Sequence, residues 1–506
     1  MDPSDDPAQP SFPVRQGVLV RARNGDVIRY DSTGLVLRLS DRVIEDIRQR
    51  MGAPDPGAGA QAAQRGDLAA AVAALDGLDA WDIRADGDWL RFSARLPGRQ
   101  GARGFRRHRK GGGIIADAPG PLFGVFGIGG ARAALAAPGP SDFPYHVLGV
   151  ADDIGAVGQS GVDRAETTDQ LDQLREMTHE ALVAQACLGW QMDKHGPLPL
   201  FVARVETDRS ASAAELAAGP ALDNLMIAAD NLRRAAASLG KEARIFAVAL
   251  DFALEELGGD AVAYRNGMIS LMQTIEDRLA ERGFDTPVFV ARFDLGGPGM
   301  ATEAQVRGQW ELAWNCGDHR LVMSAPGYMF HTDDYARPTL AARHHMAEMT
   351  AAAVTAASVR RRTDEPLTDG WRCPLFHLAE VESRADGSAV IRMIAQAASD
   401  LTIEPGDAPL DDARPVGFSL QGATNDARIT AMSIEPEDAQ TILLHLDRMP
   451  AGNSVEVAYA WGEPDPGAAV AVRDGWELTA ADGRTLRRWA LPCLLPVRPG
   501  RMRNDD

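Results

Sequence analysis

The chain of 506 residues lacks the cysteine pattern of a metal or disulfide framework. Its four cysteines are widely separated and none stands in a CxxC pair, so we expect buried free thiols, with no metal site and no cofactor. Basic residues are also scarce: 52 Lys and Arg stand against 71 Asp and Glu, which gives a formal net charge of -19. This excess of negative charge argues against a nucleic-acid partner and against docking on anionic lipid.

Long apolar runs and a secretion signal are missing as well. The chain has no run of about 20 apolar residues, so we expect no membrane insertion. Residues 1–7 are acidic and rich in proline, without the basic and apolar parts of a signal peptide. We therefore expect synthesis in the cytoplasm, with release by lysis if the protein acts outside a cell.

Turn signals and composition mark three β-rich regions. Residues 1–52 are predicted to form an N-terminal attachment module, because strand-like segments flank the turn Asn24-Gly25. A linker rich in Gly and Pro follows, and residues 67–140 are predicted to form a small mixed β module. Residues 375–500 carry short strands with turn signals about every ten residues, which is the pattern of a β-sandwich.

Between these regions, residues 141–362 alternate strand-like and helix-like segments, which predicts a parallel sheet with flanking helices. The expected strands are residues 145–151, 200–205, 245–250 and 288–293, and the expected helices lie near 167–187, 219–239, 260–282 and 339–360. The glycine-rich run 123–130 lacks a GxGxxG arrangement, so we interpret it as a strand edge or turn. The predicted fold class is multidomain, α/β plus β.

A basic segment stands out in this acidic chain. Residues 99–113 hold five arginines and one lysine around His108, and end in three glycines. One interpretation is a solvated loop that pairs with neighbouring carboxylates. The other is a contact for an anionic glycan or a second subunit.

Two short segments indicate a hydrolase-like site. Gly158-Gln159-Ser160 places a serine at a glycine-flanked turn after an apolar strand, and residues 333–340 contain Asp334 and Arg337 just before a helix. A serine hydrolase needs a hydroxyl nucleophile, a histidine that takes its proton, and an acid that orients the histidine.

On these residues, the central region resembles the SGNH hydrolases, specifically the sialate O-acetylesterase-like carbohydrate esterases, whose first motif reads Gly-Gln-Ser-Asn. The resemblance covers roughly residues 143–362 and implies a three-layer α/β/α domain with a parallel sheet. It is supported by a helix and strand at 260–293 and by a closing helix after Pro338. By carry-over, Ser160 matches the nucleophile and Asp334 the orienting acid.

Other parts of the family's site are replaced. Gly161 stands where the family has asparagine, residues 206–210 replace a glycine motif, and residues 250–253 replace an oxyanion-hole element. Arg337 occupies the histidine position, and arginine stays protonated and offers no lone pair, so it cannot act as the base. His331, on the same loop, is the best substitute.

We therefore expect a glycan-recognition protein on an inactive esterase fold, in which Gln159, Asp208, Arg209 and Arg337 bind the sugar. The domain layout resembles spike and fibre proteins of phages and gene transfer agents. This resemblance implies a polysaccharide partner, homo-oligomeric assembly through the N-terminal region, and a place on a particle surface. Two alternatives stay open: an active carbohydrate O-acetylesterase with an altered base, and a structural assembly subunit.

Overall fold

The structure is a computed structural model. It describes the backbone of residues 17–21, 27–31 and 34–38, and then residues 73, 75 and 77–500, except 110, 153, 161, 210, 252–259, 297–299, 359–369 and 411–414. The chain divides into two compact units, residues 1–76 and 77–506. In the first unit, β1 (Gly17–Arg21), β2 (Val27–Asp31) and β3 (Gly34–Arg38) form an antiparallel sheet in chain order.

The second unit begins with an antiparallel sheet of four strands, β4 (Ala80–Asp86), β5 (Trp89–Arg95), β6 (Ala102–His108) and β7 (Ile114–Ala116). About half of the basic segment 99–113 is therefore a strand, β6, rather than a loop. Arg106 is buried, pairs with Asp117, and places its guanidinium 5.9 Å from the ring centre of Trp89. Arg106 therefore pairs with a carboxylate, as one interpretation expected, but it does so from a buried strand position rather than from a solvated loop.

A largely parallel sheet follows, with the strand order β12-β10-β14-β8-β15-β16-β17, and β11 pairs with β14 beside β10. The strands are β8 (Leu122–Gly129), β10 (Val147–Val150), β11 (Val157–Gln159), β12 (Leu171–Gln173), β14 (Leu200–Thr207), β15 (Ala243–Asp251), β16 (Phe289–Phe293) and β17 (Leu321–Pro326). The expected strands at 145–151, 200–205, 245–250 and 288–293 correspond to β10, β14, β15 and β16.

The glycine-rich run that we interpreted as a strand edge or turn is β8, which lies in the middle of the parallel sheet. It pairs with β14 on one side and β15 on the other. Its glycines allow close packing: an added Cβ at Gly129 would lie 2.2 Å from the carbonyl oxygen of Asp251, and one at Gly127 2.0 Å from Glu180 Oε1. The α/β part therefore begins before residue 141, the start expected from sequence.

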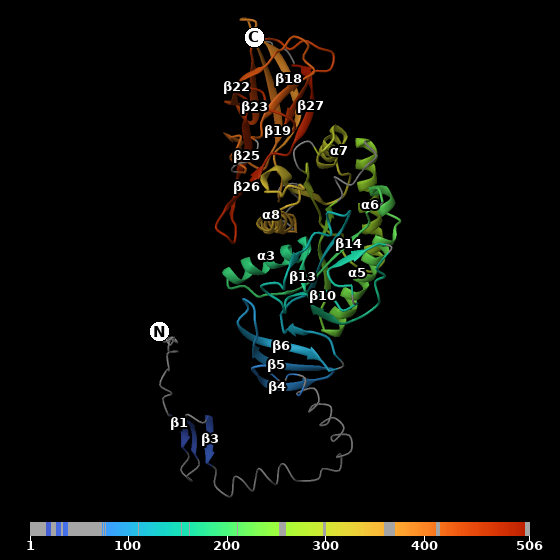
Figure 1. Cartoon of the computed structure of the whole chain (residues 1–506), viewed down its shortest axis with the longest axis vertical. Coiled ribbons are helices and arrows are strands. Elements are labelled where there is room, and N and C mark those ends of the chain that lie inside the picture. Colours follow the sequence, from blue (N-terminus) through green and yellow to red (C-terminus); the bar gives the residue numbers. More distant parts are fainter. Residues whose placement is uncertain are drawn as a thin grey trace, which may run out of the picture. The chain divides into compact units, whose positions relative to one another are not determined.

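Helices cover both faces of this sheet (Figure 1). The pair α3 (His179–Asp193) and α8 (Leu340–Ser358) packs together on one face, and α5 (Pro220–Ser238) packs on β8 and β14 from the other, with α6 (Ala261–Ala280) beside it. The short α4 (Ala213–Leu216) and α7 (Glu303–Trp314) both contact α6. No helix among the described residues is long and apolar enough to cross a membrane.

Residues 375–499 form β-structure, as the turn spacing predicts. A sheet of seven strands has the order β21-β24-β27-β18-β19-β23-β22, and β20, β25 and β26 form a second sheet. The strands are β18 (Leu375–Ser383), β19 (Ala389–Gln396), β20 (Thr402–Pro405), β21 (Phe418–Gln421), β22 (Ile429–Glu435), β23 (Asp438–Leu446), β24 (Glu456–Tyr459), β25 (Val470–Thr479), β26 (Thr485–Trp489) and β27 (Cys493–Pro499). Both sheets contribute to one buried apolar core.

Helix α8 is joined to the turn between β25 and β26. His345 Nε2 lies 2.8 Å from Asp482 Oδ2, and the backbone N–H of Ala481 donates to Glu348 Oε1 at 2.9 Å. A second link runs from α7, where Arg307 donates to both carboxylate oxygens of Glu456 at 2.7 and 2.8 Å. The α/β part and the C-terminal β-structure are therefore held together by side chains from both.

Candidate functional site

Ser160 lies at the end of β11, which pairs with the edge of β14 opposite to β8. Its backbone N–H donates to the carbonyl of Thr207 at 2.8 Å, and the preceding residue, Gln159, is exposed. Strands in a sheet lie about 4.8 Å apart, so β11 is about 10 Å from the central strand β8. The serine that the sequence singled out therefore follows a peripheral strand.

The glycine before this serine has a packing role. Gly158 faces Glu206 across the two strands, and an added Cβ would lie 2.1 Å from Glu206 Oε2. Glu206 accepts from the fully buried Arg204 at 2.7 Å, and Arg204 also donates to Asp152 Oδ1 at 3.3 Å. Burial raises the pKa of both carboxyl groups, against the lowering effect of Arg204. The Gly-Gln-Ser turn covers this buried ion cluster, which consists of Asp152, Arg204 and Glu206.

The loop that carries Asp334 and Arg337 lies at the surface. Arg337 pairs with Asp333 at 3.4 Å, and its guanidinium lies 4.9 Å from the ring centre of Tyr335. His331, Asp334 and Arg337 are all exposed. Among the described residues, no hydrogen bond or ion pair joins these three residues to Ser160.

The predicted binding residues Asp208 and Arg209 follow β14. The N–H of Asp208 donates to the carbonyl of Gly129 at 3.0 Å, which places Asp208 beside the end of the central strand. Arg209 is exposed. Of the residues predicted to bind sugar, Asp208 therefore lies nearest to the end of β8.

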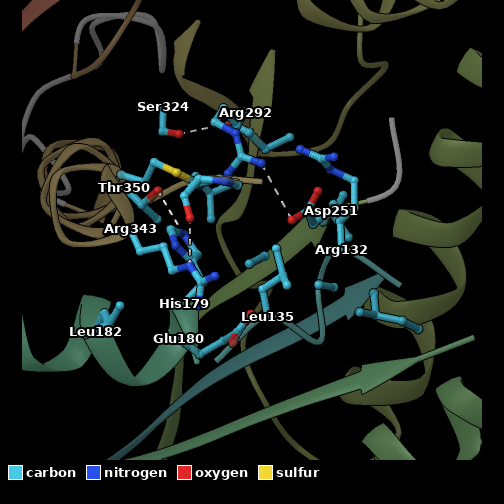
Figure 2. A pocket seen from close by; sticks show the side chains of 18 residues that line it. Arg132, Leu135, His179, Glu180, Leu182, Asp251, Arg292, Ser324, Arg343 and Thr350 are labelled. Atoms are coloured by element: carbon cyan, nitrogen blue, oxygen red, sulfur yellow. Dashed lines mark hydrogen bonds and ion pairs between the residues drawn. The ribbon is translucent and has the colours of Figure 1, made fainter. Parts of the chain in front are cut away.

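A pocket of about 730 Å³, including the solvent at its mouth, opens at the carboxyl ends of β8, β15, β16 and β17. Ligand sites in open parallel sheets occur at this edge of the sheet. The pocket is lined by three arginines, several other polar residues and an apolar wall (Figure 2). The polar lining residues are Arg132, His179, Glu180, Asp251, Arg292, Ser324, Arg343 and Thr350.

Two of the arginines share one carboxylate partner, Asp294, and Figure 2 shows Arg292 and Arg132 on the side of the pocket that also carries Asp251. Arg292 Nη2 lies 3.0 Å from Asp294 and 3.7 Å from Asp251, and Arg132 Nη2 lies 3.6 Å from Asp294. Burial alone would raise the pKa of Asp294, but Arg292 and Arg132 outweigh it and hold that pKa below its ordinary value. Asp294 therefore stays ionised and fixes both guanidinium groups. Arg132 also donates to the carbonyl of Ala336, at 2.9 Å.

The opposite side of the pocket carries Arg343, His179 and Glu180 (Figure 2). Arg343 Nε donates to the carbonyl of Pro338 at 3.1 Å, and its Nη1 donates to the carbonyl of Ala136 at 2.8 Å. Carbonyl oxygens orient a guanidinium without neutralising its charge. Arg343 therefore brings a fixed positive charge to the pocket.

His179 is held neutral. Its Nε2 lies 3.1 Å from the hydroxyl of Thr350 on α8, and burial, together with Arg292, lowers its pKa to about 3. A neutral imidazole beside a hydroxyl could in principle act as a base. However, Thr350 is only 3% exposed, at the contact between α3 and α8, so its hydroxyl is poorly placed to attack a substrate.

Glu180 is the most perturbed acid of the pocket. Its side chain is 3% exposed and packs over Gly127 of β8, and its Oε2 has no hydrogen-bond partner. Burial raises its pKa to about 7. Near neutral pH this carboxyl group can therefore be protonated and can either donate or accept a hydrogen bond.

The turn after the central strand lacks a nucleophile. Residues 130–136, which are all described, read Gly-Ala-Arg-Ala-Ala-Leu-Ala, without Ser, Thr, Cys, Asp or Glu. Ser324 lines the pocket, but its hydroxyl is buried and donates to the carbonyl of Ala291 at 3.2 Å. The described residues include no group of three His, Cys, Asp or Glu placed to hold a metal ion. The arrangement is suited to binding polar or anionic groups.

Sequence reasoning missed most of the pocket. His179 and Glu180 fell inside a helix expected to begin near 167, whereas α3 begins at His179 with Thr178 as its cap. Arg292 was included in an expected strand without a role. A usable signal was present, since Asp251, Arg292 and Ser324 all stand at or near the ends of apolar strands that meet at one edge.

No protein-family model matches the chain, and no curated protein sequence matches it. Among solved structures, a protein from Arabidopsis thaliana determined by X-ray diffraction at 1.6 Å resolution is similar at 13% identity. The match covers 47% of this chain and 98% of the plant chain, with a TM-score of 0.32.

Proposed function

We propose that this chain is a glycan-recognition protein that binds saccharide without hydrolysing it, on an SGNH-esterase-like α/β domain that has lost its catalytic residues. The observation that carries the proposal is the pocket at the carboxyl edge of the parallel sheet. It is lined by three guanidinium groups and by the carboxyl groups of Glu180 and Asp251, while residues 130–136 after the central strand offer no nucleophile. Arginine and carboxyl groups are well suited to hydrogen-bond the hydroxyls of a sugar.

The strand order supports the proposed relation to SGNH hydrolases. In the order β14-β8-β15-β16-β17, the first long parallel strand of the chain, β8, lies inside the sheet. The next strand, β14, is added on one side of β8, and β15, β16 and β17 are added on the other side, so the strand order reverses beside β8. In such sheets the ligand site lies at the reversal, where this pocket is found. A family nucleophile would be expected after β8, where this chain has glycine and alanine. The domain would then lack two catalytic groups: the nucleophile after β8 and the histidine that Arg337 replaces.

The surrounding regions fit a role in recognition at a particle surface. We propose that residues 375–500 are an accessory β-sandwich, in keeping with the core that the two C-terminal sheets share. We further propose that the N-terminal β-rich region attaches the protein to its own copies or to a larger spike-like assembly. The bacteriophage-like or gene-transfer-agent-like setting rests on this layout.

The test pairs a binding assay with a hydrolysis assay on the full chain. We expect binding to a subset of polysaccharides on a glycan array, with hydrolysis of p-nitrophenyl acetate and acetylated glycans at the buffer rate. Ser160→Ala and Thr350→Val separate the two candidate hydroxyls. Hydrolysis that is lost in either variant would favour the O-acetylesterase. Silence on all glycans, with tight self-association through residues 1–140, would favour the structural subunit.

A further inference from the structure

We propose that the pocket selects saccharides that carry one carboxylate, with Arg343 as the anchor of that carboxylate and Glu180 as the partner of a sugar hydroxyl. This inference rests on the proposed function and specifies its ligand class. It follows from the unequal pairing of the pocket arginines, from the overall charge of the pocket, and from the unsatisfied oxygen of Glu180.

The pocket arginines differ in what already binds them. Arg292 and Arg132 lie within ion-pair distance of Asp294, and Arg292 also lies near Asp251. Arg343, in contrast, is held by the carbonyls of Pro338 and Ala136, and no ion pair joins it to a carboxylate among the described residues. Its remaining N–H groups are therefore available to an incoming anion, and a guanidinium binds a carboxylate through paired hydrogen bonds.

The charge of the pocket matches a single negative charge. Three guanidinium groups stand against the carboxylates of Asp251 and Asp294. Asp333 also acts on Arg343 but is paired with Arg337, so one positive charge remains when Glu180 is protonated. His179 adds none, because the imidazole is neutral. A monocarboxylate restores neutrality, whereas a phosphate dianion brings more charge than one guanidinium offsets. The charge balance therefore favours a carboxylate over a phosphate ester.

Glu180 supplies the second point of recognition. Its carboxyl group is buried in the pocket wall, and its Oε2 lacks a hydrogen-bond partner. A buried polar atom without a partner is unfavourable, so a ligand hydroxyl that reaches it gains more than it would in water. Since Glu180 comes from α3 and Arg343 from α8, the two groups can bind different parts of one ligand. A sugar with a carboxylate and a free hydroxyl has this chemistry.

Isothermal titration of the full chain tests the assignment directly. The probes are glucuronic and galacturonic acid, with glucose, galactose and methyl galacturonate as uncharged counterparts. We expect the acids to bind at least about 10-fold more tightly than their uncharged counterparts, since a hydrogen bond to a charged group is strong enough to give this ratio. Equal binding of acid and methyl ester would overturn the inference, as would tighter binding of galactose 6-phosphate.

Variants identify the anchor. Arg343→Gln removes the charge and should weaken acid binding about 10- to 100-fold, a larger loss than for the uncharged sugars. Arg233→Gln is the matched control, because Arg233 on α5 is also bonded to a backbone carbonyl but does not line the pocket. Circular dichroism and thermal melting check that both variants fold. Unchanged acid affinity in Arg343→Gln contradicts the assignment.

The outcomes separate this inference from the proposed function. Binding of neutral glycans alone would leave the recognition function standing and reject the carboxylate anchor. Serine- or threonine-dependent hydrolysis would reject the recognition function, whichever sugar is preferred. An absence of binding to every acidic sugar rejects the inference by itself.

Discussion

The peripheral turn at Ser160 and the central pocket at the end of β8 are both rich in charged and polar residues, but they are built in opposite ways. At the peripheral turn, Arg204 is fully buried and bonded to Asp152, Glu206 and a backbone carbonyl. At the pocket, Arg343 is bonded to two carbonyls, and among the described residues no carboxylate forms an ion pair with it. Arg204 is neutralised by carboxylates inside the fold, whereas Arg343 faces a pocket with its charge uncompensated by an ion pair.

The difference shows why a motif that resembles an active site can have a structural cause. Gly158 is needed because Glu206 leaves no room for a Cβ at this position. Ser160 stands in the turn that follows, where its backbone N–H is bonded to Thr207 beside the buried ion cluster. A glycine-serine pair beside an apolar strand therefore identifies a tight turn. Only the position of that strand within the sheet decides whether the turn faces a pocket.

The largest expected effect is on stability, at the peripheral turn. Arg204→Met leaves the buried carboxyl groups of Asp152 and Glu206 without their cation, so we expect a loss of about 3–5 kcal/mol at pH 7. The loss should shrink as the pH falls and these two groups become protonated. Urea denaturation measures it. In contrast, Arg343→Gln should lower the free energy of unfolding by less than about 1 kcal/mol. If Arg343→Gln were as destabilising as Arg204→Met, the two sites would not differ in the way described.

The second effect is a pH-dependent stability that belongs to the pocket. The pKa of Glu180 is about 7 in the folded protein and 4.5 ordinarily, so the native state holds this proton more tightly than the unfolded chain. Its contribution is present below pH 4.5 and is lost as the pH rises through 7. Glu180→Gln cannot ionise, so relative to wild type it should gain up to roughly 3 kcal/mol between pH 5 and pH 8.

Denaturation curves at both pH values measure this gain in the free energy of unfolding. The charged and titratable groups that face Glu180, such as Asp251, Arg292 and His179, affect the stability of wild type and variant alike. His179 acts in the opposite sense in the wild type, because its lowered pKa costs stability when the pH falls below 6.5. A constant difference between Glu180→Gln and wild type across this range would show that Glu180 is not ionising in the folded protein.

A smaller effect tests the packing of the central strand. Gly129→Ala places a Cβ against the backbone oxygen of Asp251, which cannot move without separating β8 from β15, so we expect a loss of about 1–3 kcal/mol. Gly104→Ala is the matched control, since its Cβ would have its nearest contact at 3.6 Å. Thermal melting compares the two variants. Equal melting temperatures would mean that β8 is not tightly enclosed.

The smallest expected effect is at Ser160 itself. Its structural hydrogen bond is made by the backbone, so Ser160→Ala should change stability by less than about 0.5 kcal/mol and leave saccharide binding intact. Titration with uronic acids and a denaturation curve check both points. A large loss of binding would place the functional site at the peripheral turn after all.

Local patterns in the sequence were sufficient for most elements but not for their order in space. The strands β10, β14, β15 and β16 and the helices α5, α6 and α8 were each predicted from periodicity and capping. The strand β8 was missed because its glycines weaken a strand pattern, although burial between two parallel neighbours requires them. The strand β17 and the helix α7 were also missed.

The candidate site could be predicted less well than the fold. Assigning the first strand to residues 145–151 made Ser160 the apparent nucleophile, whereas strand pairing puts β8 in that place. The roles of Arg343 and Glu180 depend on how α3 and α8 pack together on the sheet, and these two residues are 163 positions apart in the chain. No local pattern in the sequence encodes such contacts.

Helix α8 both lines the pocket and contacts the C-terminal β-structure. One side contributes Arg343, Met346 and Thr350 to the pocket, and the residues between them, His345 and Glu348, hold the β25–β26 turn. A shortened protein that ends after this helix would leave two polar side chains without their partners next to the ligand site. The C-terminal β-structure therefore helps to hold the helix that lines the pocket, and we expect an isolated α/β fragment to be a poor substitute for the whole protein in a ligand screen.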